Sequence, residues 1–411
     1  MFFFHKPLLT LLLGCVIKLA LAQERDSIRL QQYGDSSTTH LNMDAVYNRP
    51  FLISDKMPVA VGGYLEANTL HQTTEGISEG LSFQARRLTI FMSASISRRL
   101  KFLMEMEFED GGSEIGIEFA AMDLSLHPAL NIRGGIFMNP IGAFNQNHDG
   151  PKWEFIDRPE VAVHLLPATW SNPGFGLYGK AYHGPWIFGY EAYLSNGFDG
   201  SIIDNKENKS FLPAVKNKEG RFEESSNGRA LFTGKLVVKN RGIGEIGFSY
   251  MGGVYNQFQA DGILLDKKRR VDVVAIDFNT TIRLLKTRLV GEIVYAHIDV
   301  PDTYTQQFGQ NQVGMFFDLV QPVVRRPFFD WPNAIFYAAV RVDYVDWNTD
   351  ALTETGFSIG DQQWSVTPAI SFRPTQQTVI RLNYRYTWTR DLLNNPAERT
   401  ASWLFGFSTY F

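Results

Sequence analysis

The chain has 411 residues, of which 44% are hydrophobic and 20% charged, and its formal net charge at pH 7 is −4. This slight acidic excess argues against a nucleic-acid partner, because such partners bind to basic surfaces. The only cysteine, Cys15, lies near the N-terminus, so the rest of the chain can form neither a disulfide nor a cysteine-ligated metal centre.

Residues 1–22 have the features of a secretory signal peptide. Lys6 precedes an apolar run at 8–17, and Ala20-Leu21-Ala22 fits an A-x-A cleavage site. The apolar run is too short to be a spanning helix. We therefore expect an exported protein; a lipoprotein site at Cys15 is the alternative.

Residues 23–57 show no strand pattern. They begin with polar residues and later contain Tyr47-Asn48-Arg49-Pro50-Phe51-Leu52. We expect a periplasmic N-terminal leader that is disordered up to about residue 43 and could lie against the mouth of the domain that follows.

From residue 58 to residue 411, apolar side chains recur at every second position. Between 378 and 390, for example, one face carries Leu382, Tyr384 and Trp388, while the other carries Arg381 and Arg385. Strands with lipid on one side and water on the other have this pattern. About sixteen such runs predict an all-β fold, a transmembrane antiparallel β-barrel. We expect its strands at 58–70, 83–97, 99–109, 115–126, 130–138, 174–182, 185–196, 229–239, 243–255, 271–284, 287–299, 312–321, 334–346, 362–373, 378–390 and 401–411.

The connections between these runs alternate in length, as the short periplasmic turns and long external loops of such barrels do. The apolar phase switches near Ala121, which predicts a bulge there. The segment 322–333 is long for a turn and is the weakest point of the strand count. We expect the long external loops at 71–82, 139–173, 197–228, 256–270, 300–311, 347–361 and 391–400.

The third and longest loop, 139–173, is the candidate constriction loop. In sixteen-stranded porins a loop at this position folds inward and narrows the channel. An ordered external loop that never enters the lumen is the alternative. The polar residues that we assign to a constriction are Asn145, Asn147, His148, Asp149, Lys152, Asp157 and Arg158.

Charged residues of both signs fall on the predicted inner face, where we also place acidic residues such as Glu191, Glu292 and Asp343. A mixed lining of this kind is typical of general diffusion pores. A separate basic run, Lys267-Lys268-Arg269-Arg270, could gather anions or pair with lipopolysaccharide phosphates, or be a solvated loop end. The candidate pore-lining residues are Arg87, Glu105, Glu107, Arg133, Lys180, Arg229, Lys235, Arg283, Arg341, Arg373, Arg381 and Arg385.

The chain ends in an alternating aromatic segment that closes on Phe411. This ending resembles the signal that the outer-membrane barrel-assembly machinery reads, although a terminal strand in a soluble sheet would also alternate. We expect that machinery, together with outer-membrane lipid and lipopolysaccharide, among the partners.

The usual catalytic fingerprints are missing from the sequence. It contains no G-x-S-x-G, P-loop or H-E-x-x-H motif, and the adjacent pair His148-Asp149 is weak evidence for a metal site. We therefore expect neither an enzyme nor a bound cofactor.

Three segments, 83–88, 105–110 and 133–142, carry a resemblance to a known family. The last reads Arg-Gly-Gly-Ile-Phe-Met-Asn-Pro-Ile-Gly. Together they resemble the phosphate-selective porin family of Gram-negative outer membranes. The resemblance implies a homotrimer of sixteen-stranded barrels that passes small anions. Ile136 and Met138 stand where that family has polar and lysine residues, so phosphate specificity does not follow.

The expected function is that of an outer-membrane porin, a water-filled channel for passive diffusion of small hydrophilic solutes, leaning towards anions. The alternative is a non-channel or plugged outer-membrane barrel that acts as a receptor or adhesion scaffold, with the third loop and the leader filling the lumen.

Overall fold

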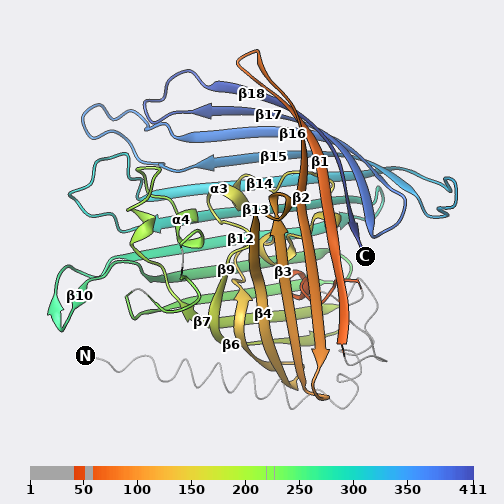
Figure 1. Ribbon diagram of the computed structural model, residues 1–411, viewed down its shortest axis with the longest axis horizontal. Coiled ribbons are helices and arrows are strands. Elements are labelled where there is room, and N and C mark those ends of the chain that lie inside the picture. Colours follow the sequence, from red (N-terminus) through yellow and green to blue (C-terminus); the bar gives the residue numbers. More distant parts are fainter. Residues whose placement is uncertain (1–40, 51–58, 219, 226) are drawn as a thin grey trace.

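The computed structural model describes residues 41–50 and 59–411 except 219 and 226; the predicted signal peptide and most of the predicted leader lie outside these residues. In the described part of the chain, sixteen strands close into one antiparallel barrel (Figure 1), which confirms the predicted fold class. Each strand pairs with its neighbours in chain order, and β1 pairs with β18 to close the barrel.

The strand bounds agree with the expected runs to within a few residues at most ends. They are β1 (Val59–Thr74), β2 (Ile77–Ser95), β3 (Leu100–Glu109), β4 (Glu114–His127), β5 (Leu130–Met138), β6 (Ser171–His183), β7 (Trp186–Asn196), β8 (Ala230–Asn240), β9 (Gly244–Val254), β12 (Arg270–Ile282), β13 (Thr287–Ile298), β14 (Asn311–Arg325), β15 (Ile335–Asp346), β16 (Gln362–Arg373), β17 (Thr378–Arg390) and β18 (Glu398–Tyr410).

The alternation in the sequence corresponds to the two sides of the barrel wall. In β17, Arg381 is 1% exposed on the inner side, whereas the next residue, Leu382, is 41% exposed on the outer side. Successive side chains of a strand point to opposite faces, so a strand between lipid and a polar interior needs this pattern.

The register shifts in the described strands include two bulges that place an extra charged residue inside the barrel. In the β1–β2 pairing, Glu66 lies opposite Arg87 and Ala67 opposite Ala85, so Arg86 is an extra residue. As a result both arginines point into the barrel. In the β3–β4 pairing, the extra residue is Glu118, three positions before the predicted bulge site at Ala121.

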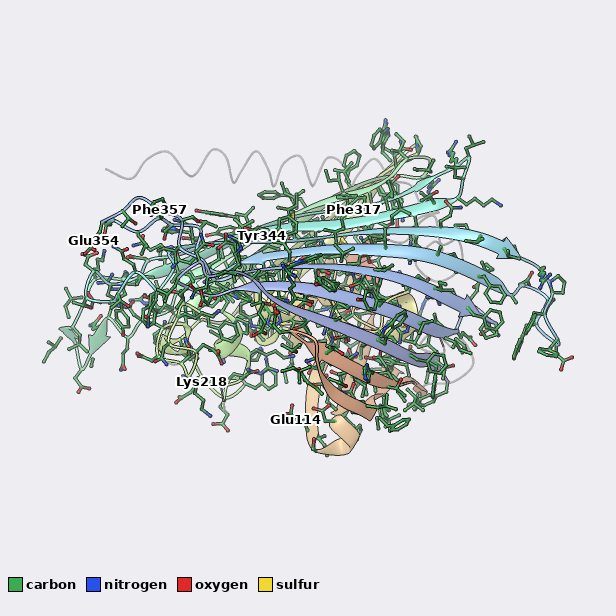
Figure 2. The ribbon with its side chains drawn as sticks, turned by 90° about the horizontal axis from the view of Figure 1, so that it is seen from above. Glu114, Lys218, Phe317, Tyr344, Glu354 and Phe357 are labelled. Atoms are coloured by element: carbon green, nitrogen blue, oxygen red, sulfur yellow. The ribbon has the colours of Figure 1, made fainter. Side chains whose placement is uncertain are left out.

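The connections at one end of the barrel are short turns, and those at the other end are mostly long. The predicted loop at 71–82 is wrong, because β1 and β2 continue until Glu75 and Gly76 form a two-residue turn with φ of 47° and 84°. Within the expected loop 256–270, β10 (Gln259–Ala260) and β11 (Ile263–Leu264) form a hairpin that projects from this end (Figure 1). Glu354 and Phe357 lie among the loops at the same end (Figure 2).

The interior holds a hydrophobic core as well as charged residues. Its largest cluster joins Trp153 and Leu165 of the third loop to the inward wall residues Val273 and Phe316 and to Leu212 of the next long loop. The short helix α3 (Val161–His164) lies inside the barrel against β14 and β15 (Figure 1). This packing differs from the water-filled lumen expected from the sequence, for which a lumen filled by the third loop and the leader was the alternative.

Residues 41–50, the described part of the expected leader, are folded against the turn end of the barrel. The 3-10 helix η1 (Asn42–Asp44) begins after Leu41, which packs with Met43 against Tyr178 and Ile187. Disorder was expected from the sequence up to about residue 43, yet burial of Leu41 and Met43 gives this segment a defined position. No helix in the described residues is both long enough and apolar enough to cross a membrane.

Candidate constriction site inside the barrel

The third loop leaves β5 at Asn139 and returns to β6 after Trp170. Asn145 closes its neck: the side-chain amide donates to the carbonyl oxygens of Asn139 and Trp170 at 2.8 and 2.9 Å and accepts from the Trp170 N–H at 2.7 Å. These bonds replace strand pairing at the point where the chain turns inward. The loop therefore enters the barrel as a compact unit.

The first part of the loop is held by the wall of β8, β9 and β13. Glu292 accepts hydrogen bonds from the backbone N–H groups of Ala143 and Phe144 at 2.8 and 3.2 Å. Lys235 donates to the Gly142 carbonyl and also pairs with Asp277 at 2.9 Å. Because Gly142 has a φ of 65° and a Cβ there would lie 2.3 Å from a Glu292 oxygen, this corner requires glycine.

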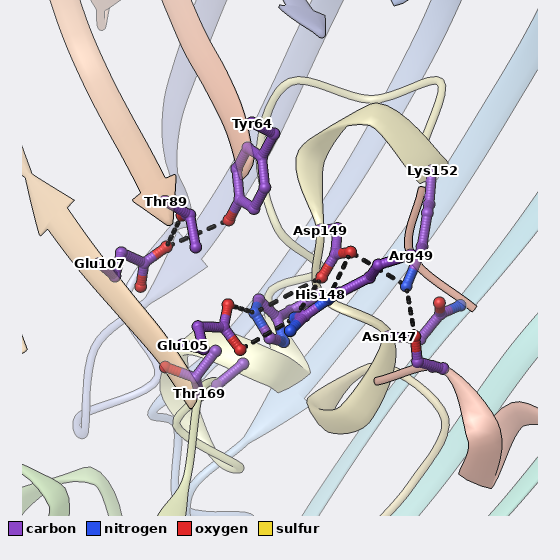
Figure 3. A network of polar contacts seen from close by, with 12 residues as sticks. Arg49, Tyr64, Thr89, Glu105, Glu107, Asn147, His148, Asp149, Lys152 and Thr169 are labelled. Carbon is purple, nitrogen blue, oxygen red and sulfur yellow. Dashed lines mark hydrogen bonds and ion pairs between the residues drawn. The ribbon is translucent and has the colours of Figure 1, made fainter. Parts of the chain in front are cut away.

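The middle of the loop carries a buried ionic cluster (Figure 3). His148 Nε2 lies 3.1 Å from Glu105 on β3, and Asp149 accepts a hydrogen bond from the Tyr410 hydroxyl at 2.6 Å. The guanidinium of Arg49 lies between Glu105 and Asp149, at 2.9 and 2.8 Å from their oxygens, and over the ring of Phe91. Five segments, from residues 41–50 to β18 at the other end of the chain, thus meet at this cluster.

The same cluster contains His148 and Asp149, the adjacent pair that is weak evidence for a metal site in the sequence. Oxygen and nitrogen atoms of Glu105, His148 and Asp149 lie within 4.8 Å of one another, close enough to share an ion. However, Arg49 already bonds both carboxylates and supplies the positive charge between them. The arrangement is that of an internal ion pair rather than of a metal centre.

The far part of the loop is held by arginines from β15, β16 and β17. Arg381 donates to the carbonyl oxygens of Gly150 and Phe155 at 3.2 and 2.7 Å, and Arg373 pairs with Glu154 at 2.9 Å. In addition, Asn383 accepts from the Ile156 N–H at 2.7 Å. This side of the wall therefore binds the loop backbone directly.

Asp157 joins the loop to two strands at once. It pairs with Arg385 of β17 at 2.8 Å and with the bulge residue Arg86 of β2 at 2.5 Å. Burial alone would raise the pKa of Asp157, but Arg385 and Arg86 outweigh this effect and hold its pKa below the ordinary value. The carboxylate is therefore charged at neutral pH and links the loop to β2 and β17, the strands that flank β1 and β18 where the barrel closes.

The structure places the predicted constriction residues inside the barrel. Asn145, His148 and Asp149 are buried, and Asn147 accepts a hydrogen bond from Trp153 through its backbone carbonyl. Lys152 pairs with Asp149 at 3.1 Å and donates to the Ala45 carbonyl. Arg158 lies 3.6 Å from Glu107.

Most of the predicted pore-lining residues are paired within the barrel or at its turn-side mouth instead of facing an open lumen. At the mouth, Arg133 pairs with Asp123, and Lys180 pairs with Asp44. Closely packed partners also surround Arg87, Glu105, Glu107, Lys235, Arg341, Arg373, Arg381 and Arg385.

Arg229 and Arg283 differ from this group. Both are exposed and lie just outside the strands, before β8 and after β12 respectively. Strand alternation therefore no longer directs their side chains inward, and Arg229 instead covers the ring of Phe258 at 5.2 Å.

The basic run Lys267–Arg270 does not form a free cationic patch. Arg269 pairs with Asp266 at 2.8 Å and Asp299 at 3.2 Å, and Arg270 pairs with Asp272 at 3.1 Å. Neighbouring carboxylates thus neutralise much of its charge.

Several residues that hold the loop were not identified from the sequence. Arg86 was missed because strict alternation places only one of two adjacent arginines inside, and the bulge that turns it inward has no clear signal. Arg49 lies in a segment that shows no strand pattern. Glu154 and Glu160 are in the loop. The one signal in the sequence that could have identified them is their acidic charge, which matches the inward arginines of β16 and β17.

A small cavity lies beside the loop. Between the loop and the wall of β15–β18 there is a cavity of about 10 Å³, room for roughly one water molecule. Four charged groups on the side of β2, β3 and β17 keep side-chain exposures of 18–28%; they are Arg86, Glu109, Asp157 and Arg385. Elsewhere around the loop, Lys152 is 18% and Arg288 of β13 36% exposed.

No protein-family model matches the chain. The chain is 25% identical over 376 residues to an uncharacterized protein of Aquifex aeolicus (strain VF5), covering 85% of this chain and 80% of the relative.

Solved structures of outer-membrane channels resemble the fold. They include an anion-selective porin from Comamonas acidovorans (12% identity, TM-score 0.53, 86% of this chain and 99% of that chain) and the outer membrane channel DcaP of Acinetobacter baumannii (12%, 0.53, 86% and 97%). Another is OprB of Pseudomonas putida (10%, 0.53, 86% and 94%). At these identities the likeness shows that the chain has the closed sixteen-stranded fold of outer-membrane porins.

Proposed function

We propose that the protein is an outer-membrane porin of a Gram-negative bacterium whose channel is narrowed by the loop between β5 and β6. The observation that carries this proposal is the attachment of that loop to opposite walls, through Lys235 of β8 on one side and Arg381 of β17 on the other. A loop held across the lumen leaves only a small cross-section for water and solutes. The expected solutes are therefore small and hydrophilic.

The path that we propose follows the wall of β2, β3 and β17. Arg86, Asp157 and Arg385 remain partly exposed there, whereas apolar packing around Trp153 and Leu165 closes the β12–β14 side. Paired charges of both signs support at most a slight anion preference. A phosphate-selective site would need several unpaired converging cations, so we do not extend the proposal to phosphate specificity.

Single-channel recording in planar bilayers tests the proposal. The parent protein should give small, steady conductance steps, and deletion of residues 145–158 should enlarge them several-fold. Deletion of the external hairpin 259–264 is the control and should leave the steps unchanged, since β10 and β11 pair only with each other among the described strands. Absence of steps from both the parent and the loop deletion would contradict a porin.

A plugged barrel that acts as a receptor or scaffold is the second candidate. It is favoured by the burial of inward charged residues, because Glu105 is 0% and Arg381 1% exposed. The same recordings separate the two candidates. A silent parent with a conducting loop deletion would identify a plug, whereas steady parental steps would identify a constricted pore.

The outer-membrane setting adds partners to this proposal. The side chain of Phe411 is 52% exposed at the end of β18, where the barrel-assembly machinery could bind it. On the outer wall, Trp364, Trp388 and Arg390 line a groove of about 360 Å³ that would suit a lipopolysaccharide phosphate and its acyl chains. We also propose a homotrimer, by resemblance to porins, which crosslinking of intact membranes would test.

A further inference from the structure

The connection between β14 and β15 projects beyond the neighbouring turns at the turn end of the barrel (Figure 1). β14 pairs with β13 only as far as Val320, whereas its pairing with β15 continues to Arg325. The backbone N–H of Arg326 then donates to the Ala334 carbonyl at 3.1 Å and closes a hairpin. This hairpin explains why the segment 322–333 is long for a turn. The proposed channel gives it no role.

The hairpin packs its aromatic rings on the outer face of the barrel wall. The ring centroids of Phe328 and Trp331 lie 5.5 and 6.0 Å from that of Phe372 on β16. Phe336 of β15 stacks on the same ring at 4.5 Å. Ser371, the residue before Phe372, bonds the third loop inside the barrel, so Phe372 is on the opposite, lipid-facing side. The aromatic layer therefore continues the lipid-facing wall.

The tip of the hairpin exposes a large apolar side chain. Phe328 and Trp331 exchange backbone hydrogen bonds of 3.1 and 3.0 Å, so Phe329 and Asp330 form a two-residue turn. Phe329 has a φ of 47°, a conformation that bulky residues rarely adopt, and it is 84% exposed. Glycine or asparagine would suit this turn better. Packing within the chain does not explain an exposed phenylalanine here, but a contact outside the chain does.

The base of the same hairpin carries two adjacent arginines. Arg325 and Arg326 are exposed, and neither guanidinium forms an ion pair within the described residues. They differ in this from Arg341 and Arg373 on the adjacent strands, which pair with carboxylates inside the barrel. Asp330 is the one carboxylate in 322–334, so the hairpin carries a net positive charge.

We infer that the hairpin 322–334 is a membrane anchor that binds the headgroup layer of anionic phospholipids. Rings with a polar edge, such as that of Trp331, are favoured at the boundary between hydrocarbon and water, and neighbouring basic residues attract lipid phosphates. A second copy of the hairpin would offer only Asp330 to the two arginines, whereas a headgroup layer offers many phosphates. The inference goes beyond the proposed porin, because it requires a barrel in a membrane but no conduction.

Electron paramagnetic resonance of a nitroxide on the hairpin tests the anchor. The chain after residue 22 contains no cysteine, so Asn333→Cys gives a single labelling site and keeps the aromatic and basic residues. The protein is placed in vesicles of phosphatidylethanolamine and phosphatidylglycerol. Oxygen concentrates in hydrocarbon and a nickel chelate in water. The ratio of oxygen to nickel collisions should be several-fold higher than for a label at Gln376→Cys, which is exposed in the neighbouring turn.

Variants in the labelled protein separate the two kinds of contact. Phe329→Ser should lower the collision ratio in any lipid, because it removes the exposed ring. Joint replacement of Arg325 and Arg326 by Gln should lower it in vesicles that contain phosphatidylglycerol and have little effect in pure phosphatidylcholine. The matched control is joint replacement of Arg98 and Arg99 by Gln, an exposed pair in another turn at the same end. This control should leave the ratio unchanged.

Three results would overturn the inference. The first is a label at Asn333→Cys that is as accessible to nickel as the label at Gln376→Cys. The second is a collision ratio that does not change when phosphatidylcholine replaces phosphatidylglycerol, which would exclude anionic lipid as the occupant. The third is spin–spin broadening that disappears on dilution with unlabelled protein, which would assign the hairpin to an interface between copies. None of these readouts needs current, so a protein that forms no channel contradicts the porin proposal and leaves this test intact.

Discussion

Arg49 donates hydrogen bonds to both oxygens of Asp149, at 3.0 and 2.8 Å, and to Glu105 at 2.9 Å. These bonds join the segment 41–50 to the tip of the third loop and to β3 (Figure 3). Burial would lower the pKa of Arg49, but the two carboxylates more than compensate and raise it above the ordinary value. The N-terminal segment is therefore an anchor of the constriction loop.

Replacing Arg49 by Gln should loosen this anchor. The change leaves Glu105 and Asp149 buried side by side without their shared cation, and breaking a buried ion pair in this way costs about 3–5 kcal/mol. We expect the barrel to unfold at a lower temperature in heat-dependent SDS gel migration and the channel current to become noisier. Arg98→Gln, in an exposed turn, is the control, and equal behaviour of the two variants would refute the anchor role.

Arg381 and Arg385 should behave differently although both are inward arginines of β17. Arg381 is buried against loop carbonyl oxygens, so Arg381→Glu should displace the loop and raise conductance. Arg385 is 24% exposed beside the proposed path, so Arg385→Glu should shift the reversal potential towards cations with a smaller change in conductance. Identical effects of the two variants would argue against the proposed path along β17.

Acidification should release the far part of the loop. Burial raises the pKa of Asp157, but Arg385 and Arg86 lower it by more than burial raises it. The folded-state pKa of Asp157 is therefore below the ordinary value. A carboxylate of this kind stabilises the fold at pH values above its ordinary pKa, and the contribution is lost as pH falls through the lowered pKa. The attachment of the loop through Asp157 should stay constant from neutral pH to about pH 5 and weaken below about pH 4.

The variant Asp157→Asn distinguishes the effect of protonating Asp157 from the effects of other carboxylates that titrate in acid. It should show at neutral pH part of the higher, noisier conductance that the parent shows in acid. Asp302→Asn, in an exposed external loop, should resemble the parent at every pH. A parental profile in Asp157→Asn would show that other groups govern the acid response.

The barrel was predictable from the sequence because lipid and interior impose different side chains on alternate positions. Arg381 and Leu382 are adjacent yet occupy opposite environments, and this contrast repeats around the wall. In β12 the rule is weaker: Ile276 faces outward, but Val273 is equally apolar and faces the loop. The alternation of side chains predicts strand β12, but it does not reveal what the inner face of this strand contacts.

The inward fold of the loop could be proposed but not established from the sequence. Some of its anchors join residues more than two hundred positions apart, such as Ile156 with Asn383, and no local pattern specifies such a pair. Arg86 depends on a bulge, and Arg49 on the docking of a segment without periodicity. These contacts arise from the closed barrel, which brings distant strands around one loop.

Gly142 offers a test of how sharply the loop corner is defined. Its φ of 65° is strained for alanine by about 1–2 kcal/mol, and an added Cβ would lie 2.3 Å from a Glu292 oxygen. Gly142→Ala should therefore push the corner away from Glu292, break the bonds to Ala143 and Phe144, and raise conductance. Gly76→Ala is a close control, because Gly76 has a φ of 84° but a Cβ added there would meet nothing within 4 Å. The control should lose a little heat stability and keep the parental conductance; if both variants conduct like the parent, the Glu292 contact does not set the position of the loop.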